Sequence, residues 1–297
     1  MTILITGGSG FIGQGLVKFL LEKSIPVKVV DLNPFPNPDI ETIVGDLRDN
    51  EVVKKAVHKV EGIIHLAALT SVLESIKNPF DVYRTNLETT SLLLEAGRRQ
   101  EIQNFILAST NAVVGNKLNT KINENSSLNP LTPYGGTKAA SEMLLSAYAS
   151  SYGMITSSIR MTNIYGTGMQ HKDSFIPRLM KAVINKSGVE IFGDGEQLRD
   201  YLYLTDTVYA FYLALKENIS GPLTTGYGQS ISVNALYDLV CETTGTQIPV
   251  KRVEAKSGEM RAVEVDISRA RSFGFKPLVS IREGLAKTWQ DISSSVV

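Results

Sequence analysis

The sequence predicts an α/β protein built on a doubly wound parallel sheet. Short apolar runs alternate with helical patterns through roughly the first half of the 297-residue chain. A glycine-rich segment, TGGSGFIG at 6–13, separates the first expected strand from the first expected helix. Apolar residues make up 43% of the chain and charged residues 20%, which is typical of a soluble globular protein. Strands that alternate with helices pair in parallel through right-handed crossovers, and this arrangement gives a doubly wound sheet.

The elements of the first half follow from local periodicity. Strands are expected at the short apolar runs 2–6, 27–30, 42–44, 62–68, 104–109 and 155–160. Apolar residues at helical spacing predict helices over 11–23, 50–60, 79–99 and 134–152. The helix over 79–99 begins with Pro79, at a position where its missing N–H costs least.

The pattern changes after Asn163. A loop leads into an expected helix over 174–186, and a glycine turn leads into an aromatic strand within 193–206. Near the end, Ser280 and Glu283 have the spacing of a capping box, which predicts the start of a further helix. We find neither an internal repeat nor a linker, so we expect two interleaved parts around one cleft.

Charge and composition exclude several classes of function. Thirty basic residues balance thirty acidic ones, so nothing favours a nucleic acid or an anionic membrane as the principal partner. No segment approaches the ~18 apolar residues of a membrane span, and the chain begins directly with a strand, so we expect a cytoplasmic protein. The single cysteine, Cys241, rules out an internal disulfide. The histidines His58, His65 and His171 lack metal-ligand spacing, so no metal is expected.

The glycine-rich segment is the first candidate binding motif. Gly7, Gly10 and Gly13 recur at three-residue steps between a strand and a helix. Gly7 permits a tight turn, Gly10 lets the backbone approach a pyrophosphate, and Gly13 lets helix and strand pack closely. The N-terminus of the helix then offers N–H groups and a partial positive charge to the phosphates. This context favours a dinucleotide site of Rossmann type over a purely structural turn.

Two acidic residues follow at the ends of the next strands. Asp31 ends the second strand, 18 residues after Gly13, where a carboxylate can accept hydrogen bonds from the ribose hydroxyls of NAD and would repel a 2′-phosphate. The sequence therefore predicts NAD in preference to NADP, although Asp31 could instead cap a turn. Asp46 follows the third strand and could hold the adenine amino group or serve only in a turn.

A tyrosine and a lysine four residues apart form the candidate catalytic pair. Tyr134 and Lys138 share one face of an expected helix. Lowering the pKa of a tyrosine from ~10 by ~3 units needs ~4 kcal/mol, about what a unit charge at ~4 Å supplies at an effective dielectric of ~20. We therefore expect Lys138 to make Tyr134 acidic, although a surface pair would have the same spacing. Ser109 and Thr110 end the fifth strand, where a hydroxyl could bond a substrate oxygen and relay its proton.

Taken in order, these motifs resemble those of the extended short-chain dehydrogenase/reductase family. The resemblance rests on TGGSGFIG, GD at 45–46, HLAA at 65–68, Thr110 and YGGTK at 134–138, and it continues through RMTNIYG and RDYLYLTD. Within that family the layout is most similar to the NAD-dependent nucleotide-sugar epimerases and dehydratases, with UDP-galactose (UDP-glucose) 4-epimerase as the best-known pattern. The resemblance spans nearly the whole chain.

The resemblance implies roles for individual residues. The catalytic group would be Thr110, Tyr134 and Lys138. NAD would be held by Gly7, Gly10, Phe11, Ile12, Gly13, Asp31, Asp46, Leu47, Leu66, Ala67, Ala68, Asn86, Tyr134 and Lys138. The nucleotide sugar would be bound by Ser109, Thr110, Asn163, Arg199, Lys256 and Arg261. From the residues alone, Asn163 could instead cap a turn, Arg199 could pair with Asp200, and Arg261 could be a solvated strand residue.

The resemblance also narrows the reaction. An NAD-dependent epimerase would pass through a transient 4-keto sugar, with Tyr134 as base. The family's 4,6-dehydratases carry an Asp–Glu pair after the threonine, but Asn111 and Ala112 stand there in this chain and cannot perform acid/base work. An NAD(P)H-dependent reductase of a nucleotide-linked 4-keto sugar remains an alternative, as does a non-catalytic NAD-sensing protein. Gly136, Thr137 and Val114 depart from residues common in relatives, which leaves the sugar open.

The expected domain organisation has two interleaved parts. Residues 1–163 form the NAD-binding domain, to which 199–230 returns, whereas 164–198 and 231–297 form a smaller substrate-binding region. Relatives commonly dimerise through two helices per subunit, which would be 79–99 and 134–152, so we expect a homodimer.

Overall fold

The computed structural model of the protein describes residues 1–117, 120–255 and 261–294, and its largest element is a parallel sheet of seven strands. The strands are β1 Ile3–Thr6, β2 Val27–Asp31, β3 Thr42–Val44, β4 Gly62–His65, β5 Asn104–Thr110, β6 Ile155–Met161 and β10 Gly221–Thr225. Their order is β10-β6-β5-β4-β1-β2-β3. The winding direction reverses at β1, which pairs with β2 on one side and β4 on the other, and ligands bind at the carboxyl ends of strands at such a point.

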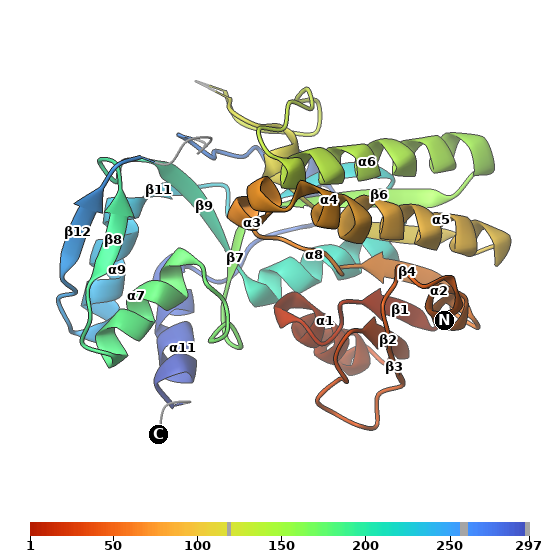
Figure 1. Ribbon diagram of the computed structural model, residues 1–297, viewed down its shortest axis with the longest axis horizontal. Helices are drawn as coiled ribbons and strands as arrows, with labels where there is room; N and C mark the ends of the chain where they lie inside the picture. The colour runs from red at the N-terminus through yellow and green to blue at the C-terminus, as the bar shows by residue number, and fades with distance from the viewer. Residues whose placement is uncertain (118–119, 256–260, 295–297) are drawn as a thin grey trace.

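Helices cover both faces of this sheet. On one face lie α1 Phe11–Glu22 and α8 Leu204–Lys216, and on the other lie α2 Asn50–Val57, α5 Thr89–Arg99 and α6 Pro133–Tyr152 (Figure 1). The alternation of side chains along a strand supplies both cores: Ile3 and Ile5 pack with α1 and α8, whereas Leu4 packs with the helices opposite. The predicted doubly wound α/β fold is confirmed.

The helix expected over 79–99 is interrupted. After α3, Val72–Lys77, a short α4, Pro79–Val82, runs into a π-helical turn, η1 Tyr83–Glu88, before α5 continues. A π turn places an extra residue within a helix, and here that turn contains the buried Asn86. The side chain of Asn86 accepts from Leu69 N at 2.8 Å and donates to Leu69 O at 3.0 Å, which ties the turn to the loop after β4. Apolar periodicity did not reveal this interruption, because the turn is stabilised by a contact with a distant loop.

A smaller layer lies beside the carboxyl ends of the central strands. It contains the three-stranded sheet β11-β9-β7 and the pair β12-β8. These strands are β7 Asn163–Tyr165, β8 Val189–Phe192, β9 Leu198–Tyr203, β11 Ser230–Ser232 and β12 Val250–Val253. The accompanying helices are α7 Phe175–Ile184, α9 Val233–Thr244 and α11 Ile281–Ser294, whereas α10 Ser268–Ser272 packs beside β10 of the central sheet. Tyr165, Leu236 and Leu285 belong to a third apolar core that holds much of this layer together.

The chain passes between the two layers more than once. β9 pairs with β7 and β11 in the small sheet, and the chain then returns to the central sheet through α8 and β10 before it leaves again at β11. The division into 1–163 with 199–230, and 164–198 with 231–297, remains a proposal. Residues 199–203 pair within the small sheet, so by strand pairing the chain returns to the central sheet from Leu204 onward. Within the described residues, no helix combines the length and apolar character needed to cross a membrane.

Candidate active site

Two adjoining cavities open along the carboxyl edge of the central sheet. The first, which we call the glycine-loop cavity, is lined by Gly7, Gly10, Gly13, Asp31, Asp46, Leu47, Leu66, Ala67, Ala68 and Lys138, among others. The second, which we call the Arg199 cavity, is lined by Thr110, Asn111, Ala112, Asn163, Tyr201 and Arg199, among others. Their volumes, about 550 and 570 Å³, suit small-molecule ligands. Both cavities share the lining residues Phe11, Ile12, Thr70, Tyr134, Met161 and Lys172.

Two positions of the glycine loop, Gly7 and Gly13, leave no room for a side chain. Gly7 has a φ of +69°, and a Cβ there would lie 2.7 Å from Ala67 N. A Cβ on Gly13 would lie 2.3 Å from Gly7 O, because α1 begins directly against the turn. The backbone is therefore packed as closely as a pyrophosphate-binding turn requires, with the N-terminus of α1 facing the cavity.

Asp31 is held by the backbone at the mouth of this cavity. Its Oδ2 accepts from Ser9 N and its Oδ1 accepts from Asn33 N, both at 3.0 Å. These bonds fix the carboxylate beside the glycine loop, where it lines the cavity. A ribose diol could complete its remaining acceptor sites. Ribose binding by Asp31 stays a prediction.

Asp46 and Leu47 lie at the other side of the same opening. Asp46 forms an ion pair with Arg48, which also lines the cavity, and the hydrogen bond from Arg48 holds the pKa of Asp46 below its usual value. Sequence reasoning missed Arg48, although it stands only two residues beyond Asp46. Asn86, predicted to bind the cofactor, is buried beneath the cavity and does not line it; its amide bonds Leu69 and donates to Thr137 Oγ1 at 3.3 Å.

Helix α6 presents the tyrosine and the lysine together. Thr132 caps the helix by accepting from Gly135 N, and Pro133 occupies its first position, so Tyr134 lies in the first turn and Lys138 one turn later. Tyr134 borders both cavities, with Thr110 bordering the Arg199 cavity and Lys138 the glycine-loop cavity. The three predicted catalytic residues thus meet at the junction of the two cavities.

The electrostatics of this group differ from the expectation. Burial raises the pKa of Tyr134 to about 12, with a hydrogen bond to Thr110 acting in the opposite direction. Burial also lowers the pKa of Lys138 to about 8, against the charge of Glu142. The protein alone therefore does not show the acidic Tyr134 that the sequence predicts, because burial disfavours the phenolate and raises its pKa.

The ammonium of Lys138 lacks hydrogen-bond acceptors among the described residues. Its Nζ is buried, and the described protein atoms offer it no hydrogen-bond partner. A buried ammonium without acceptors is costly, whereas ribose hydroxyls in the glycine-loop cavity would supply them. Together with the tight glycine turn and the fixed carboxylate of Asp31, this makes the residues present fit a dinucleotide with a nicotinamide ribose at Lys138.

The predicted substrate residues divide into two sets. Asn163 and Arg199 both line the Arg199 cavity, where Asn163 Nδ2 donates to Asp200 O at 3.0 Å and Arg199 Nη1 donates to Leu198 O at 2.8 Å. The carboxylate of Asp200 is buried and accepts from Tyr227 N and Gly228 N.

The second set lies apart from the cavities. Ser109 is buried, lines neither cavity and donates its hydroxyl to Glu142, so its predicted contact with substrate is not seen. Side chains on a strand alternate between faces, and here Ser109 faces α6 while Thr110 faces the cavity. Arg261 is exposed and lines neither cavity, and its backbone N–H donates to Asn116 Oδ1. Lys256 lies outside the described residues.

Lys172 is a cavity residue that sequence reasoning missed. It comes from the loop before α7, is exposed, and lines both cavities. Only His171 of this loop drew attention in the sequence, because a lone lysine in a polar loop has no distinguishing spacing. The tertiary fold brings the loop over the glycine turn, with Gly168 close to the ring of Phe11.

A comparison with protein families matches this architecture. The model of a family described as the NAD dependent epimerase/dehydratase family matches residues 3–225. The chain belongs to that family. Membership in the NAD-dependent epimerase/dehydratase family confirms the resemblance found in the sequence and NAD as the cofactor.

Individual members of the epimerase/dehydratase family show similarity over the full chain. A crystal structure of UDP-glucose 4-epimerase from Thermotoga maritima with UDP-glucose is 31% identical, covers 100% of both chains and has a TM-score of 0.95. MoeE5 in complex with UDP-glucose and NAD is 32% identical, covers 100% of both chains and has a TM-score of 0.94. A dTDP-glucose 4,6-dehydratase from Streptomyces niveus is 30% identical over 308 residues, which is 97% of this chain and 91% of the relative. Family membership thus includes both epimerases and dehydratases.

Proposed function

We propose that the protein is an NAD-dependent epimerase of a nucleoside-diphosphate sugar that acts through a transient 4-keto intermediate. The observation that carries the proposal is the position of Tyr134 at the junction of the two cavities, with Lys138 on the cofactor side and Thr110 on the substrate side. The similarity to a UDP-glucose 4-epimerase supports a UDP-hexose as the substrate class.

In the proposed mechanism, Tyr134 takes the proton of the sugar 4-hydroxyl as the hydride leaves C4. Thr110 bonds the same oxygen and relays its proton, while Lys138 holds the nicotinamide ribose. NAD, held by the residues that line the glycine-loop cavity, would supply the hydride acceptor and donor for the two halves of the reaction and, in its oxidised form, a positive charge. Tyr134 then gives the proton back to the sugar oxygen.

In the protein alone, burial raises the pKa of Tyr134 to about 12, so the phenol is neutral near pH 7. A base at this position needs its pKa lowered, and a positive charge brought close to a buried phenol lowers it. The oxidised nicotinamide ring of bound NAD would be such a charge. We therefore expect Tyr134 to ionise only in the cofactor-bound protein.

The Arg199 cavity suits a substrate that is anchored at one end. Arg199 and Asn163 would bind the diphosphate, which leaves the sugar beside Thr110 free to turn over and present its other face. Asn111 and Ala112 line the same cavity at the positions where a 4,6-dehydratase needs an acid and a base. An amide and a methyl group cannot move protons, so the chain disfavours dehydration although a dehydratase is among its relatives.

Product analysis tests the proposed reaction. The purified protein is assayed for NAD that survives purification and is then incubated with UDP-, dTDP-, GDP- and CDP-sugars, with products resolved by NMR. Conversion between epimers without added cofactor supports the proposal. Strict dependence on added NAD(P)H would contradict it in favour of a 4-keto-sugar reductase, and loss of water would favour a dehydratase.

We also propose a homodimer formed through the region 79–99 and helix α6. Large apolar side chains are exposed on both: Phe80 at 68% and Tyr83 at 45% on the first, and Met143 at 57% and Tyr152 at 55% on the second. Exposed apolar residues gathered on neighbouring helices are typical of a protein interface. A second copy of the chain would cover them.

A further inference from the structure

Exposed apolar side chains line one wall of the Arg199 cavity. Val72, Leu73 and Ile76 share one face of α3, because Ile76 lies four residues after Val72 and three after Leu73. Leu73 and Ile76 are 48% and 53% exposed, although large aliphatic side chains are usually buried. Helix α3 begins two residues after Thr70, which lines both cavities, so this face lies near the junction of the cavities.

Leu131 extends this apolar surface from the loop before α6. It is 45% exposed and lines the same cavity, and its Cγ would lie 3.4 Å from a Cβ on Gly115, another lining residue. Helix α3 packs against α6, which begins two residues after Leu131 (Figure 1). Phe80 and Tyr83 of the proposed dimer surface line neither cavity, so this surface is a separate feature. We call its four members the apolar wall: Val72, Leu73, Ile76 and Leu131.

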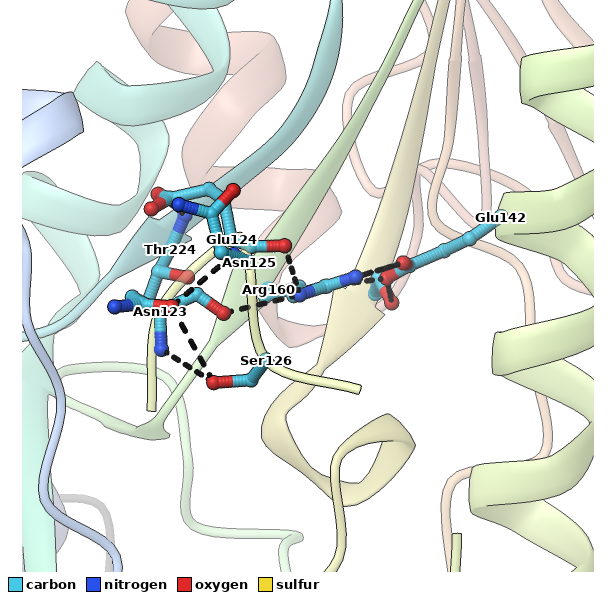
Figure 2. A network of polar contacts seen from close by, with 8 residues as sticks. Asn123, Glu124, Asn125, Ser126, Glu142, Arg160 and Thr224 are labelled. Atoms are coloured by element: carbon cyan, nitrogen blue, oxygen red, sulfur yellow. Dashed lines mark hydrogen bonds and ion pairs between the residues drawn. The ribbon is translucent and has the colours of Figure 1, made fainter. Parts of the chain in front are cut away.

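The loop that carries Leu131 is tied to the central sheet. Arg160 on β6 forms a buried, bidentate ion pair with Glu142 on α6. Its Nη1 also donates to the carbonyl oxygens of Asn123 and Glu124 in this loop, each at 3.3 Å (Figure 2). A bidentate pair has little freedom to rotate, so the loop is held in place from the core. The apolar wall therefore belongs to packed elements, and exposed apolar residues gathered at such a cavity are typical of a site for an apolar part of a ligand.

Asn111 adds an amide to the same cavity. It follows Thr110 in the 3-10 turn η2, Asn111–Val113, is 4% exposed and lines the Arg199 cavity. Its Oδ1 is buried, and no described protein atom donates a hydrogen bond to it. A buried acceptor without a donor is costly, so a ligand that brings a donor to this amide would be favoured.

The amide and the apolar wall lie where the proposed function requires the sugar. Asn163 and Arg199 would bind the diphosphate, whereas Thr110 and Tyr134 would bond the reacting oxygen. The sugar ring would then lie between these two pairs, beside Asn111 and the wall. An acylamino group combines an N–H donor for the amide oxygen with an apolar end for the wall. A hydroxyl supplies only the donor, and an ionised carboxylate supplies neither.

We infer that the substrate is a UDP-N-acylhexosamine, and that Asn111 and the apolar wall select it over an unsubstituted hexose. The inference rests on the proposed function and names the substrate class of the same site. A sugar with a hydroxyl in place of the acylamino group would leave the wall exposed to water. The acyl group would cover it and remove apolar surface from water, which favours binding.

The test compares UDP-N-acetylglucosamine with UDP-glucose. Calorimetry measures the binding of each to NAD-loaded Tyr134→Phe, which lacks the proposed base, and UDP serves as the probe without a sugar. We expect UDP-N-acetylglucosamine to bind at least ~10-fold more tightly than UDP-glucose, because an apolar group of methyl size discriminates ~10–200-fold in a hydrophobic pocket. In the unmodified enzyme, kcat/KM should favour the same sugar.

Two variants in this background assign the preference to residues. Leu73→Ser combined with Ile76→Ser changes exposed side chains, so the protein should fold, and UDP-N-acetylglucosamine should bind roughly 5–10-fold more weakly while UDP-glucose binds as before. Asn111→Leu keeps the branching of the side chain but removes the acceptor, and it should also weaken UDP-N-acetylglucosamine. UDP should bind equally in all of them. Leu21→Ser, at a 41% exposed leucine on α1 outside both cavities, is the control and should change none of the three affinities.

The outcomes separate this inference from the proposed function. UDP-glucose binding as tightly as UDP-N-acetylglucosamine, or absence of binding by either sugar, would overturn the inference. Equal losses for both sugars in the double serine variant would overturn it as well. Preferential binding of UDP-N-acetylglucosamine without formation of an epimer by the unmodified enzyme would instead contradict the proposed function, because the calorimetry does not depend on turnover.

Discussion

The hydroxyl of Thr6 lies 2.6 Å from Nδ1 of His65, and both side chains are fully buried at the carboxyl ends of the neighbouring strands β1 and β4. Thr6 Oγ1 also accepts from Ala67 N at 3.1 Å, so it holds the segment that lines the glycine-loop cavity. His65 stays neutral in the folded protein because burial lowers its pKa to about 3. The Thr6–His65 pair therefore supports the glycine-loop cavity and also makes the free energy of unfolding depend on pH.

The first prediction concerns acid stability. Between pH 6.5 and pH 3 the unfolded chain protonates His65 and the folded chain does not, so its contribution is complete above pH 6.5 and is lost as pH falls. From pH 7 to pH 5 the loss is about 2 kcal/mol. Urea unfolding should show a smaller decrease for His65→Gln than for wild type. His58→Gln, at an exposed histidine, should behave as wild type; equal decreases in all three proteins would refute the prediction.

The second prediction concerns the catalytic tyrosine. Tyr134→Phe removes the phenol but leaves the glycine loop and Asp31 intact, so NAD should still bind while kcat falls ~10²–10⁴-fold. The measurement is epimer interconversion alongside NAD titration by calorimetry. Tyr148→Phe, at a half-buried position on the same helix and outside both cavities, should retain activity. Full activity in Tyr134→Phe would remove this residue from the mechanism.

The third prediction concerns the choice of dinucleotide. Asp31→Ser removes the carboxylate that we predict to bind a ribose diol, so NAD should bind roughly 10–100-fold more weakly, since hydrogen bonds to a charged group are worth ~1.5–3 kcal/mol. NADP should bind more tightly than it does to wild type, because the charge that repels a 2′-phosphate is gone. Asp39→Asn, an exposed carboxylate on the next loop, is the control. If Asp31→Ser discriminates between NAD and NADP as wild type does, the preference for NAD depends on other residues.

The fourth prediction contrasts two glycines. A Cβ at Gly13 would lie 2.3 Å from Gly7 O, so Gly13→Ala must displace the glycine turn, lose NAD binding and destabilise the protein by ~1–3 kcal/mol. At Gly136, in α6, a Cβ meets nothing within 4 Å. Gly136→Ala should therefore be neutral or stabilise by up to ~1 kcal/mol. Urea unfolding measures both, and the reverse ranking would contradict the packing described for the loop.

The fifth prediction tests the proposed dimer. Phe80→Glu combined with Met143→Glu places charges in the apolar surface on α4 and α6, and sedimentation analysis should show a monomer where wild type is a dimer. Leu278→Glu changes a side chain that is 74% exposed and belongs to neither 79–99 nor α6, so it should leave the dimer intact. A monomeric wild type would refute the proposal outright.

Much of the fold follows from local patterns. Strand alternation and helical spacing predicted the six early strands and most helices, because each pattern depends on residues that are close in the sequence. The glycine loop was also predictable, since a tight turn between a strand and a helix needs glycine within a few residues. The same holds for Tyr134 and Lys138, whose shared face follows from one helical turn.

The parts that sequence reasoning missed depend on contacts between distant elements. Ser109 faces Glu142 and lines neither cavity because of how β5 packs on α6. Asn86 lies in a π-helical turn, and its side chain bonds a distant loop. Lys172 enters both cavities only when its loop folds over the glycine turn. The acidity of Tyr134 was misjudged for the same reason, because spacing reveals which charges are neighbours, whereas the cost of burying a phenolate is set by the whole surrounding fold.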